Sequence, residues 1–350
     1  MKRKQNNLLG IFRFSIFLTV ILAGVTFWQL GWQGLWLFFV LLILEVTFSF
    51  DNAVVNSRTL ASMSLIWQRI FLTVGIFIAV FAVRFLLPIV IVMFASGLNL
   101  GEVVSMALNN PERYGHVLHN ASPMINAFGG IFLLMIGLSY FVDYNKQIHW
   151  VRGVEPWLAR AGKFENFRAC LILLVMVVLY FTVEEKYKAM ILISSVLGTL
   201  LHIGLELFGS LFGSHSSKDI KLKTGWAAFA AFLYLEVLDA SFSFDGVIGA
   251  FAITSSVILI TSGLSAGAIW VRSLTIYLMR SGTLSKYRYL EHGAHWAIVA
   301  LGIMMLFKLF HVELPEWITG SLGLAFIILA IGSSVIEARH AKNTKNLQSS

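Results

Sequence analysis

Long apolar runs recur along this chain of 350 residues, and they constrain its fold more than any other feature. Runs of roughly 18 or more residues, each long enough to cross a hydrocarbon layer about 30 Å thick, follow one another from Phe12 to Ile336. A backbone in lipid must satisfy its own hydrogen bonds, and a helix does so within one segment. The sequence therefore predicts an all-α, polytopic membrane helical bundle.

Apolar windows predict about ten membrane-spanning helices joined mostly by short loops. The composition agrees with a lipid environment, because 58% of the residues are hydrophobic and only 13% are charged, against about a quarter charged in an average soluble domain. Two connections, 97–123 and 143–167, are longer, and we expect an interfacial helix in each. The expected spans lie near residues 12–30, 35–55, 70–96, 124–142, 168–184, 188–212, 226–248, 256–279, 294–311 and 317–336.

The distribution of basic residues predicts how the bundle is oriented. Most of the 26 Lys and Arg residues fall on one side of the expected bilayer, the side that holds both termini. Because cytoplasmic loops carry an excess of Lys and Arg, this asymmetry predicts cytoplasmic N- and C-termini and a bacterial inner-membrane location. The same rule accounts for the net charge of +8, so we expect no nucleic-acid partner. A single cysteine, Cys170, excludes an intrachain disulfide and a cysteine-based metal cluster.

An internal repeat carries most of the functional information. Residues 44–54 read LEVTFSFDNAV and residues 238–248 read LDASFSFDGVI, which align without a gap and place an acid at the same two positions of each copy. The copies lie five expected spans apart, so the two halves must have opposite orientation in the membrane. The pattern predicts a 5+5 inverted repeat, an architecture of many secondary transporters. Its parts are a first five-helix repeat at 1–186, a second, inverted one at 187–340 and a disordered tail at 341–350.

Acidic residues inside the expected spans mark the candidate site. An ionised carboxylate there costs at least a few kcal/mol, so it normally faces a cavity, an ion or an opposite charge. Two arginines, Arg84 and Arg272, each follow a glycine by nine residues and are the expected charge partners. The acids are Glu45, Asp51, Glu206, Glu236, Asp239 and Asp245.

The two motifs predict an oxygen-rich cation site at the meeting point of the halves. One regular helix cannot aim both acids of a motif at the same point, so we expect local unwinding around Phe-Ser-Phe-Asp, which would add backbone carbonyls. Such ligands suit hard divalent cations such as Mn²⁺, Mg²⁺ or Ca²⁺. Clustered carboxylates also favour the uptake of protons when the cation leaves. The expected ligands are Glu45, Asp51, Asn52, Asp239 and Asp245, with Ser49, Ser243 and Glu236 as additional candidates.

The motifs resemble those of a known family. Leu-Glu-x-x-Phe-Ser-Phe-Asp-Asn-Ala-Val and Leu-Asp-Ala-Ser-Phe-Ser-Phe-Asp-Gly-Val are similar to the two signature motifs of the TerC-like membrane family, which is associated with tellurite resistance and belongs to a wider group of cation exporters. The resemblance covers the spans from Leu35 to about Phe310, and is closest to an uncharacterised bacterial branch. It implies efflux of manganese or a similar metal. One departure is Gly246, where the family often has Ser.

These observations together predict a transporter that exports a divalent cation, with Mn²⁺ as the favoured ion and no permanently bound cofactor. Two alternatives stay open. A non-transporting membrane scaffold or stress-response partner would leave cellular metal content unchanged when Asp51 or Asp245 is neutralised. An intramembrane enzyme would use paired aspartates, but the chain lacks the Gly-x-Gly-Asp pattern of intramembrane aspartyl proteases and any Ser-His or zinc-binding His motif. We therefore expect no enzyme activity.

Overall fold

The computed structural model describes residues 9–164, 166–212, 222–312 and 316–348. Within them the chain is helical, apart from loops and one isolated β-bridge between Met63 and Lys223. The all-α prediction is therefore confirmed. The elements are η1 (Leu9–Phe12), α2 (Arg13–Phe48), α3 (Phe50–Ala61), α4 (Leu65–Phe77), η2 (Ile78–Leu86), α5 (Leu87–Ser96), α6 (Leu100–Asn109), α7 (Pro111–Asn120), α8 (Ser122–Phe141), α9 (Val154–Ala161), α10 (Phe167–Thr182), η3 (Glu185–Tyr187), α11 (Lys188–Phe212), α12 (Gly225–Ile253), α13 (Val257–Ser281), α14 (Thr283–Lys286), α15 (Leu290–Lys308) and α16 (Glu316–Gln348).

Eight helical segments in the described part of the chain are long and apolar enough to cross a membrane, which confirms a polytopic membrane bundle. The number differs from the ten that we expected for two reasons. The first two expected spans form one helical segment, Gly10–Phe48, that bends at Gly31. The fifth expected span is α10, whose 16 residues fall short of a full crossing.

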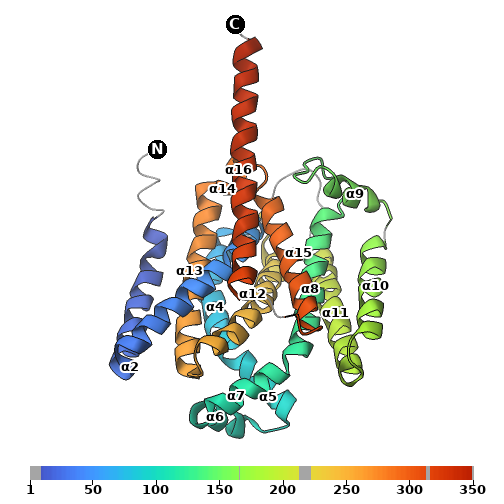
Figure 1. Cartoon of the computed structure of the whole chain (residues 1–350). Coiled ribbons are helices and arrows are strands. Elements are labelled where there is room, and N and C mark those ends of the chain that lie inside the picture. Colours follow the sequence, from blue (N-terminus) through green and yellow to red (C-terminus); the bar gives the residue numbers. More distant parts are fainter. Residues whose placement is uncertain (1–8, 165, 213–221, 313–315, 349–350) are drawn as a thin grey trace.

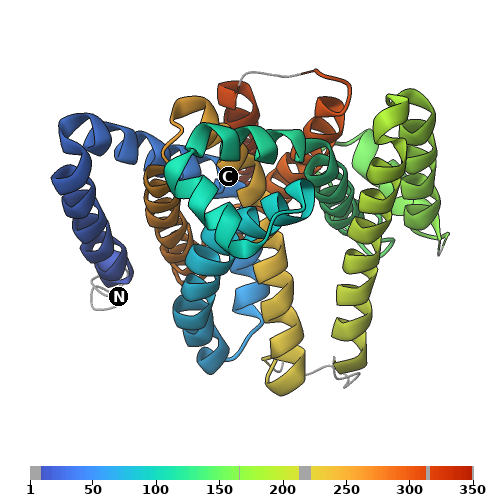
Figure 2. The ribbon, with the colours of Figure 1, turned by 90° about the horizontal axis from the view of Figure 1, so that it is seen from below.

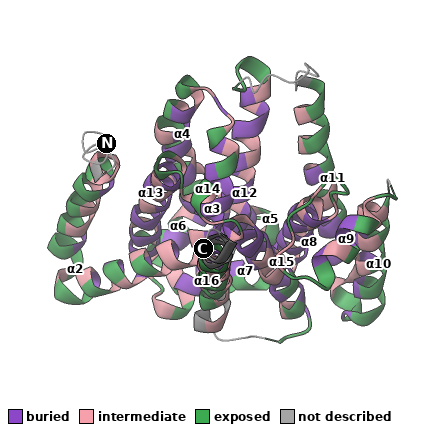
Figure 3. Ribbon diagram, turned by 90° about the horizontal axis from the view of Figure 1, so that it is seen from above, coloured by how far each residue is buried: buried purple, intermediate pink, exposed green. Residues whose placement is uncertain are grey.

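The buried centre of the bundle lies where α3, α12 and α13 meet α8 and α15. Figure 3 shows buried residues concentrated on these helices, whereas the first half of α2 and much of α10 and α11 are exposed. Helix α13 packs along α2 and α3, and α15 packs between α8 and α16. Apolar side chains on the outer helices suit a lipid surround, because a helix that faces lipid has no reason to bury them.

The two ends of the bundle differ. Figure 1 shows the N- and C-termini on the same side, with α6 and α7 on the opposite side; Figure 2, viewed from below, shows α6 and α7 in front of the bundle. We call the first side the terminal face and the second the α7 face. The 97–123 connection thus carries α6 and α7, and the 143–167 connection carries α9.

The C-terminal segment differs from our expectation. Helix α16 continues to Gln348, across most of the 341–350 segment for which we predicted disorder. The segment contains no Pro or Gly after Gly332 that would end a helix, and extending an existing helix avoids the cost of nucleating one.

Gly31 makes the bend that separates the two halves of α2. Its backbone has φ 63° and ψ −156°, a region that only glycine occupies without strain. In Figure 1 the chain descends from the terminal face along the first half of α2 and then turns inward toward α3. The bend brings the second half of α2, which carries Glu45, into the centre of the bundle.

We predict that Gly31→Ala lowers the free energy of unfolding by about 1–3 kcal/mol, the usual cost of a strained backbone. Gly24→Ala is the matched control, because it lies in the same helix with open space around its Cβ position, and there alanine favours the helix. Denaturant unfolding in detergent micelles measures both variants. Equal effects of the two substitutions would contradict the proposed strain at Gly31.

A buried carboxylate docks α9 onto the membrane-spanning bundle. Glu155 is 1% exposed and accepts three hydrogen bonds of 2.8 Å, from the His292 side chain, the Trp296 side chain and the Trp150 backbone. Burial raises the pKa of Glu155, but the hydrogen bonds from His292 and Trp296 outweigh it, so the pKa lies below its ordinary value. The ionised carboxylate therefore stabilises the docked arrangement.

The lowered pKa of Glu155 predicts a pH-dependent stability. A carboxylate with a depressed pKa in the folded state contributes stability above its unfolded pKa and loses it as the pH falls through the folded value. The difference in Tm between the wild type and Glu155→Gln is therefore expected to be largest near pH 7 and to shrink on acidification below pH about 4. Exposed Glu112→Gln serves as the control. A wild-type-to-variant difference that stays constant over this range would contradict the assignment.

Candidate functional site

The first repeated motif lies at a break between two helices. Helix α2 ends at Phe48, Ser49 has φ −101° and ψ 14°, and α3 begins at Phe50, which puts Asp51 and Asn52 in the first turn of the new helix. The expected unwinding is therefore found in this copy. The break is small, however, because the carbonyl oxygens of Glu45 and Ser49 still accept backbone hydrogen bonds of 3.0 and 3.1 Å.

The second motif does not unwind, and our expectation for it is wrong. Helix α12 runs without interruption from Gly225 to Ile253, across all of residues 238–248. Glu45 of the first motif and Asp239 of the second are instead brought to the same arginine by packing between helices. A change of backbone direction within α12 is not needed for this.

Glu45 is bound by an arginine from a π-helix. Arg84 lies on η2, a nine-residue π-helix, and its guanidinium forms a buried ion pair with Glu45. The same carboxylate accepts a hydrogen bond of 3.1 Å from the Ser49 hydroxyl, and Arg84 also donates to the Ala79 carbonyl oxygen at 2.9 Å. The π-helix is a rare form that is often found at functional sites.

Asp239 of the second motif shares the same arginine. Its Oδ2 lies 3.7 Å from Nη1 of Arg84 and 3.4 Å from Nη2 of Arg272. Asn52, from the first motif, donates a hydrogen bond of 3.1 Å to Oδ1 of Asp239. The expected partners Arg84 and Arg272 thus lie between acids, and Arg84 links the two motifs directly.

Arg272 holds the remaining acid of this group. Its two terminal nitrogens donate to the two oxygens of Glu236 at 2.8 and 2.7 Å, the fork-like geometry that binds a carboxylate most specifically. The guanidinium also lies 4.4 Å from the centre of the Phe71 ring. We call the set of Glu45, Glu236, Asp239, Arg84 and Arg272 the acid–arginine cluster; each member is at most 6% exposed.

Close glycine contacts relate the two halves in a reciprocal way. A Cβ atom at Gly75 would lie 2.7 Å from Glu236 Oε1, and a Cβ atom at Gly263 would lie 2.7 Å from Cβ of Leu41. Each of these glycines precedes an arginine by nine residues; Gly75 faces α12, which carries the second motif, and Gly263 faces α2, which leads into the first. This crossed packing is what a two-fold relation between the halves would produce.

Asp51 lies apart from the acid–arginine cluster. It is 3% exposed and accepts a 2.9 Å hydrogen bond from the backbone N–H of Asn52. A Cβ atom at Gly323 of α16 would lie 3.3 Å from Asp51 Oδ2, so the carboxylate faces that helix closely. No basic side chain in the described part of the chain forms an ion pair with it.

Several expected ligands do not converge in this arrangement. The side chain of Asp245 lies outside the described residues. Ser243 is 2% exposed, and its hydroxyl and Oδ1 of Asn52 have no hydrogen-bond partner among the described atoms. The described side chains contain no group of three or more His, Cys, Asp or Glu residues placed to hold a metal. The acids of the cluster are bridged by arginines where we expected a shared cation.

The sequence did not predict three features of the structure. Glu206, one of the acids expected inside a span, pairs with Arg168 at 2.7 Å. The docking of Glu155 by His292 carried no local signal, because Glu155 lies in a connection far from α15 in the sequence. Asn126 is 4% exposed and its Oδ1 has no partner among the described atoms; an amide inside an apolar run was a signal that could have identified it.

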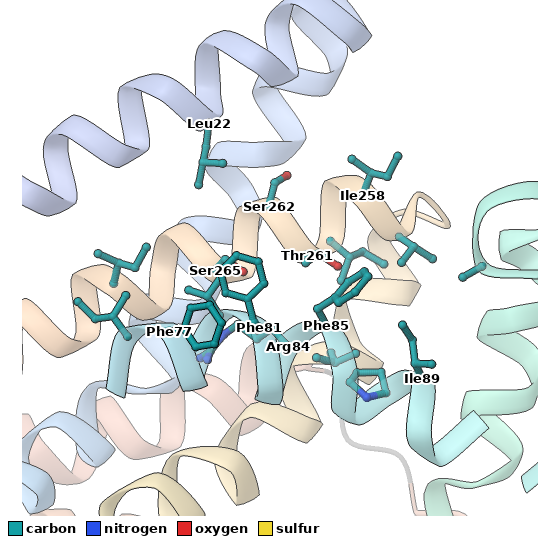
Figure 4. A pocket seen from close by; sticks show the side chains of 18 of the residues that line it. Leu22, Phe77, Phe81, Arg84, Phe85, Ile89, Ile258, Thr261, Ser262 and Ser265 are labelled. Atoms are coloured by element: carbon teal, nitrogen blue, oxygen red, sulfur yellow. The ribbon is translucent and has the colours of Figure 1, made fainter. Parts of the chain in front are cut away.

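A groove runs along the outer side of the cluster. It has a volume of about 650 Å³ and lies between the first half of α2, η2 and α13, with Arg84 in its wall. Figure 4 shows Phe77 at the end of α4 and Phe81 and Phe85 of η2 on one side, and Leu22 of α2 across from them. The lining is largely apolar and rich in aromatic side chains, and Arg84 in its wall is only 3% exposed.

The acid–arginine cluster predicts strong coupling between Arg84 and Glu45. Removing one partner of a buried pair leaves an uncompensated charge and costs about 3–5 kcal/mol. We expect Arg84→Gln and Glu45→Gln each to lower the free energy of unfolding by this amount, and the double variant to lose much less than their sum. Denaturant unfolding measures the cycle, and exposed Arg69→Gln on α4 is the control, with an effect within about 0.5 kcal/mol. Additive losses would contradict the pairing.

Comparison with known proteins gives one family. Residues 50–341, more than half of the chain, match the model of a family described as "Protein of unknown function (DUF475)". No curated protein and no solved structure matches the chain. The family match does not extend to the TerC-like family, so that resemblance stays a prediction.

Proposed function

We propose that this chain, which belongs to the DUF475 family, is a membrane transporter that moves a cation through the centre of the bundle, with a divalent metal such as Mn²⁺ as substrate. The observation that carries the proposal is the excess of buried carboxylate over buried cationic side chains around the two motifs. We further propose the identity of the metal from the ligand chemistry, and efflux as the direction of transport from the TerC-like resemblance.

The ion pairs of the cluster show this excess of buried carboxylates over buried arginines. Glu45, Asp239 and Glu236 share two guanidinium groups. Asp51 of the first motif is buried apart from them and has no ion-pair partner among the described side chains. Each ionised acid in a membrane interior costs a few kcal/mol unless a positive charge compensates it. A mobile cation would supply the missing charge. The available donors are carboxylate, amide and hydroxyl oxygens, which suit a hard divalent ion.

Arg84 gives the proposed site two states. In the structure, Arg84 forms an ion pair with Glu45 and lies close to Asp239. If a cation takes its place, the carboxylates keep a compensating charge while the arginine moves aside on η2. Since the acids belong to different halves of the chain, such an exchange couples ion binding to a movement of one half against the other, which is how alternating access works in transporters built from inverted repeats.

The proposal also includes the membrane in which the protein lies and the orientation of the chain in that membrane. We propose the bacterial inner membrane with cytoplasmic termini, because most of the basic residues fall on the side of the expected bilayer that holds both termini. A non-transporting scaffold stays the competing function. It does not require a buried carboxylate without a basic partner, such as Asp51, in the interior of the bundle.

The test is cellular manganese content in a deletion strain exposed to manganese. Complementation with the wild type is expected to lower manganese severalfold relative to the empty vector, and Asp51→Asn is expected to remove that effect, because it removes a buried charge that a cation would compensate. Glu206→Gln is the matched control: it neutralises another acid within a span, bound to Arg168 and outside the cluster, and is expected to behave as wild type.

Membrane abundance of each variant is measured by immunoblot, so that loss of function is separated from loss of protein. Equal manganese content in the empty-vector, wild-type and Asp51→Asn strains would contradict manganese transport and favour the scaffold function. A wild-type effect that Asp51→Asn retains would contradict the role of this carboxylate.

A further inference from the structure

A second cavity opens on the α7 face. It has a volume of about 680 Å³ and is lined by residues of α7, α8 and α12, with Lys308 at the end of α15. Its rim is polar, since Glu112, His116 and His119 project from successive turns of α7 into its lining. These rim side chains do not converge into a metal site among the described residues. A polar rim of this kind holds water.

The inner end of the cavity approaches the second motif. Ile248 and Phe251 line it from one face of α12, and Ser255 lines it from the connection that follows this helix. Ile248 lies only three residues after Asp245, which corresponds to about 4.5 Å along the helix axis. On the other side, the first motif is also close, because a Cβ atom at Gly246 would lie 3.3 Å from Oε2 of Glu45. The lining of the cavity therefore ends at the last residue of the second motif.

Asn126 is a buried polar group in the wall of this cavity. It comes from α8, is 4% exposed, and its Oδ1 accepts no hydrogen bond among the described atoms. Leaving a buried carbonyl oxygen unpaired costs about 1–3 kcal/mol, so such a group normally has a ligand or water. An amide oxygen is also a common ligand of hard divalent cations.

The opposite side of the acids is closed. A buried apolar cluster fills the space between the acid–arginine cluster and the terminal face; Ile11, at the start of the described chain, packs against it. Its members come from α3, α4, α12, α13 and the connection between α3 and α4. They are Leu60, Met63, Phe71, Ala228, Ala231, Phe232, Leu235 and Ile276.

We propose that the cavity on the α7 face is the aqueous vestibule of the transport site, and that Oδ1 of Asn126 is the first buried oxygen that a divalent cation meets there. This inference rests on the proposed function and adds to it the side from which the acids are reached. The structure is then a state open to the α7 face and closed to the terminal face. In an exporter with cytoplasmic termini, it is the state that releases the cation.

Thiol labelling tests the vestibule without depending on transport. Single-cysteine variants Asn126→Cys and Ser255→Cys are made in a Cys170→Ala background, and intact cells and inside-out vesicles are treated with a membrane-impermeant thiol reagent. Both positions are expected to react from the α7 face only. Ser281→Cys, at the end of α13 on the terminal face, is expected to react only from the other side, and fully buried Leu133→Cys from neither.

Labelling separates the two proposals. If Asn126→Cys reacts as expected but no manganese transport is found, the vestibule stands and the proposed substrate fails. If Asn126→Cys stays unreactive while Ser255→Cys reacts, the cavity is a shallow surface cleft and the inference is overturned, whatever the transport result.

The ligand role of Asn126 is tested by manganese flux at varied concentration. Asn126→Leu removes the oxygen at similar size and is expected to raise the half-saturating manganese concentration about tenfold, equivalent to about 1.4 kcal/mol, with little change in maximal rate. Asn126→Asp keeps an oxygen ligand and is expected to raise the half-saturating concentration much less than Asn126→Leu does. An unchanged half-saturating concentration in Asn126→Leu would overturn the ligand role.

Discussion

The buried ion pair between Arg84 and Glu45 is the interaction on which the rest of the centre depends. A lone charge in this interior would cost several kcal/mol, and each member of the pair compensates the charge of the other. Arg84 also reaches Asp239, which lies 194 residues after Glu45 in the sequence and in the other half. One guanidinium therefore fixes the relative position of the two motifs.

The surrounding structure serves this geometry. The bend at Gly31 brings the second half of α2 inward, and the close contacts at Gly75 and Gly267 let α4 and α13 approach the motif helices without a side chain between them. The π-helix η2 carries Arg84 within a segment whose regular hydrogen bonding is already altered. Such a segment is suited to a second arrangement, because changing it sacrifices fewer regular backbone bonds than changing an α-helix.

Much of this fold could be predicted from the sequence, and the limits have physical causes. Apolar length predicted most of the spans, and the cost of charge in lipid predicted that intramembrane acids such as Glu45 and Asp239 would lie beside Arg84 and Arg272. Hydropathy contains no information on backbone angles, so it could not show that Gly31 bends a continuous helical segment. Nor could spacing within one helix show that Arg84 would connect both motifs, because that contact depends on how helices from the two halves pack. Asn126 illustrates the same limit, since its unpaired oxygen is defined only by its neighbours in space.

The central claim is that the carboxylates around Arg84 bind and transport a divalent cation. Manganese flux in proteoliposomes containing the purified chain tests it most directly, with a manganese-sensitive dye inside and Glu45→Gln/Arg84→Gln as a variant that removes the buried pair together. If these carboxylates transport the cation, the wild type gives saturable manganese flux. The double variant folds but gives no flux above that of protein-free liposomes. Flux absent from both, or equal in both, would contradict the central claim.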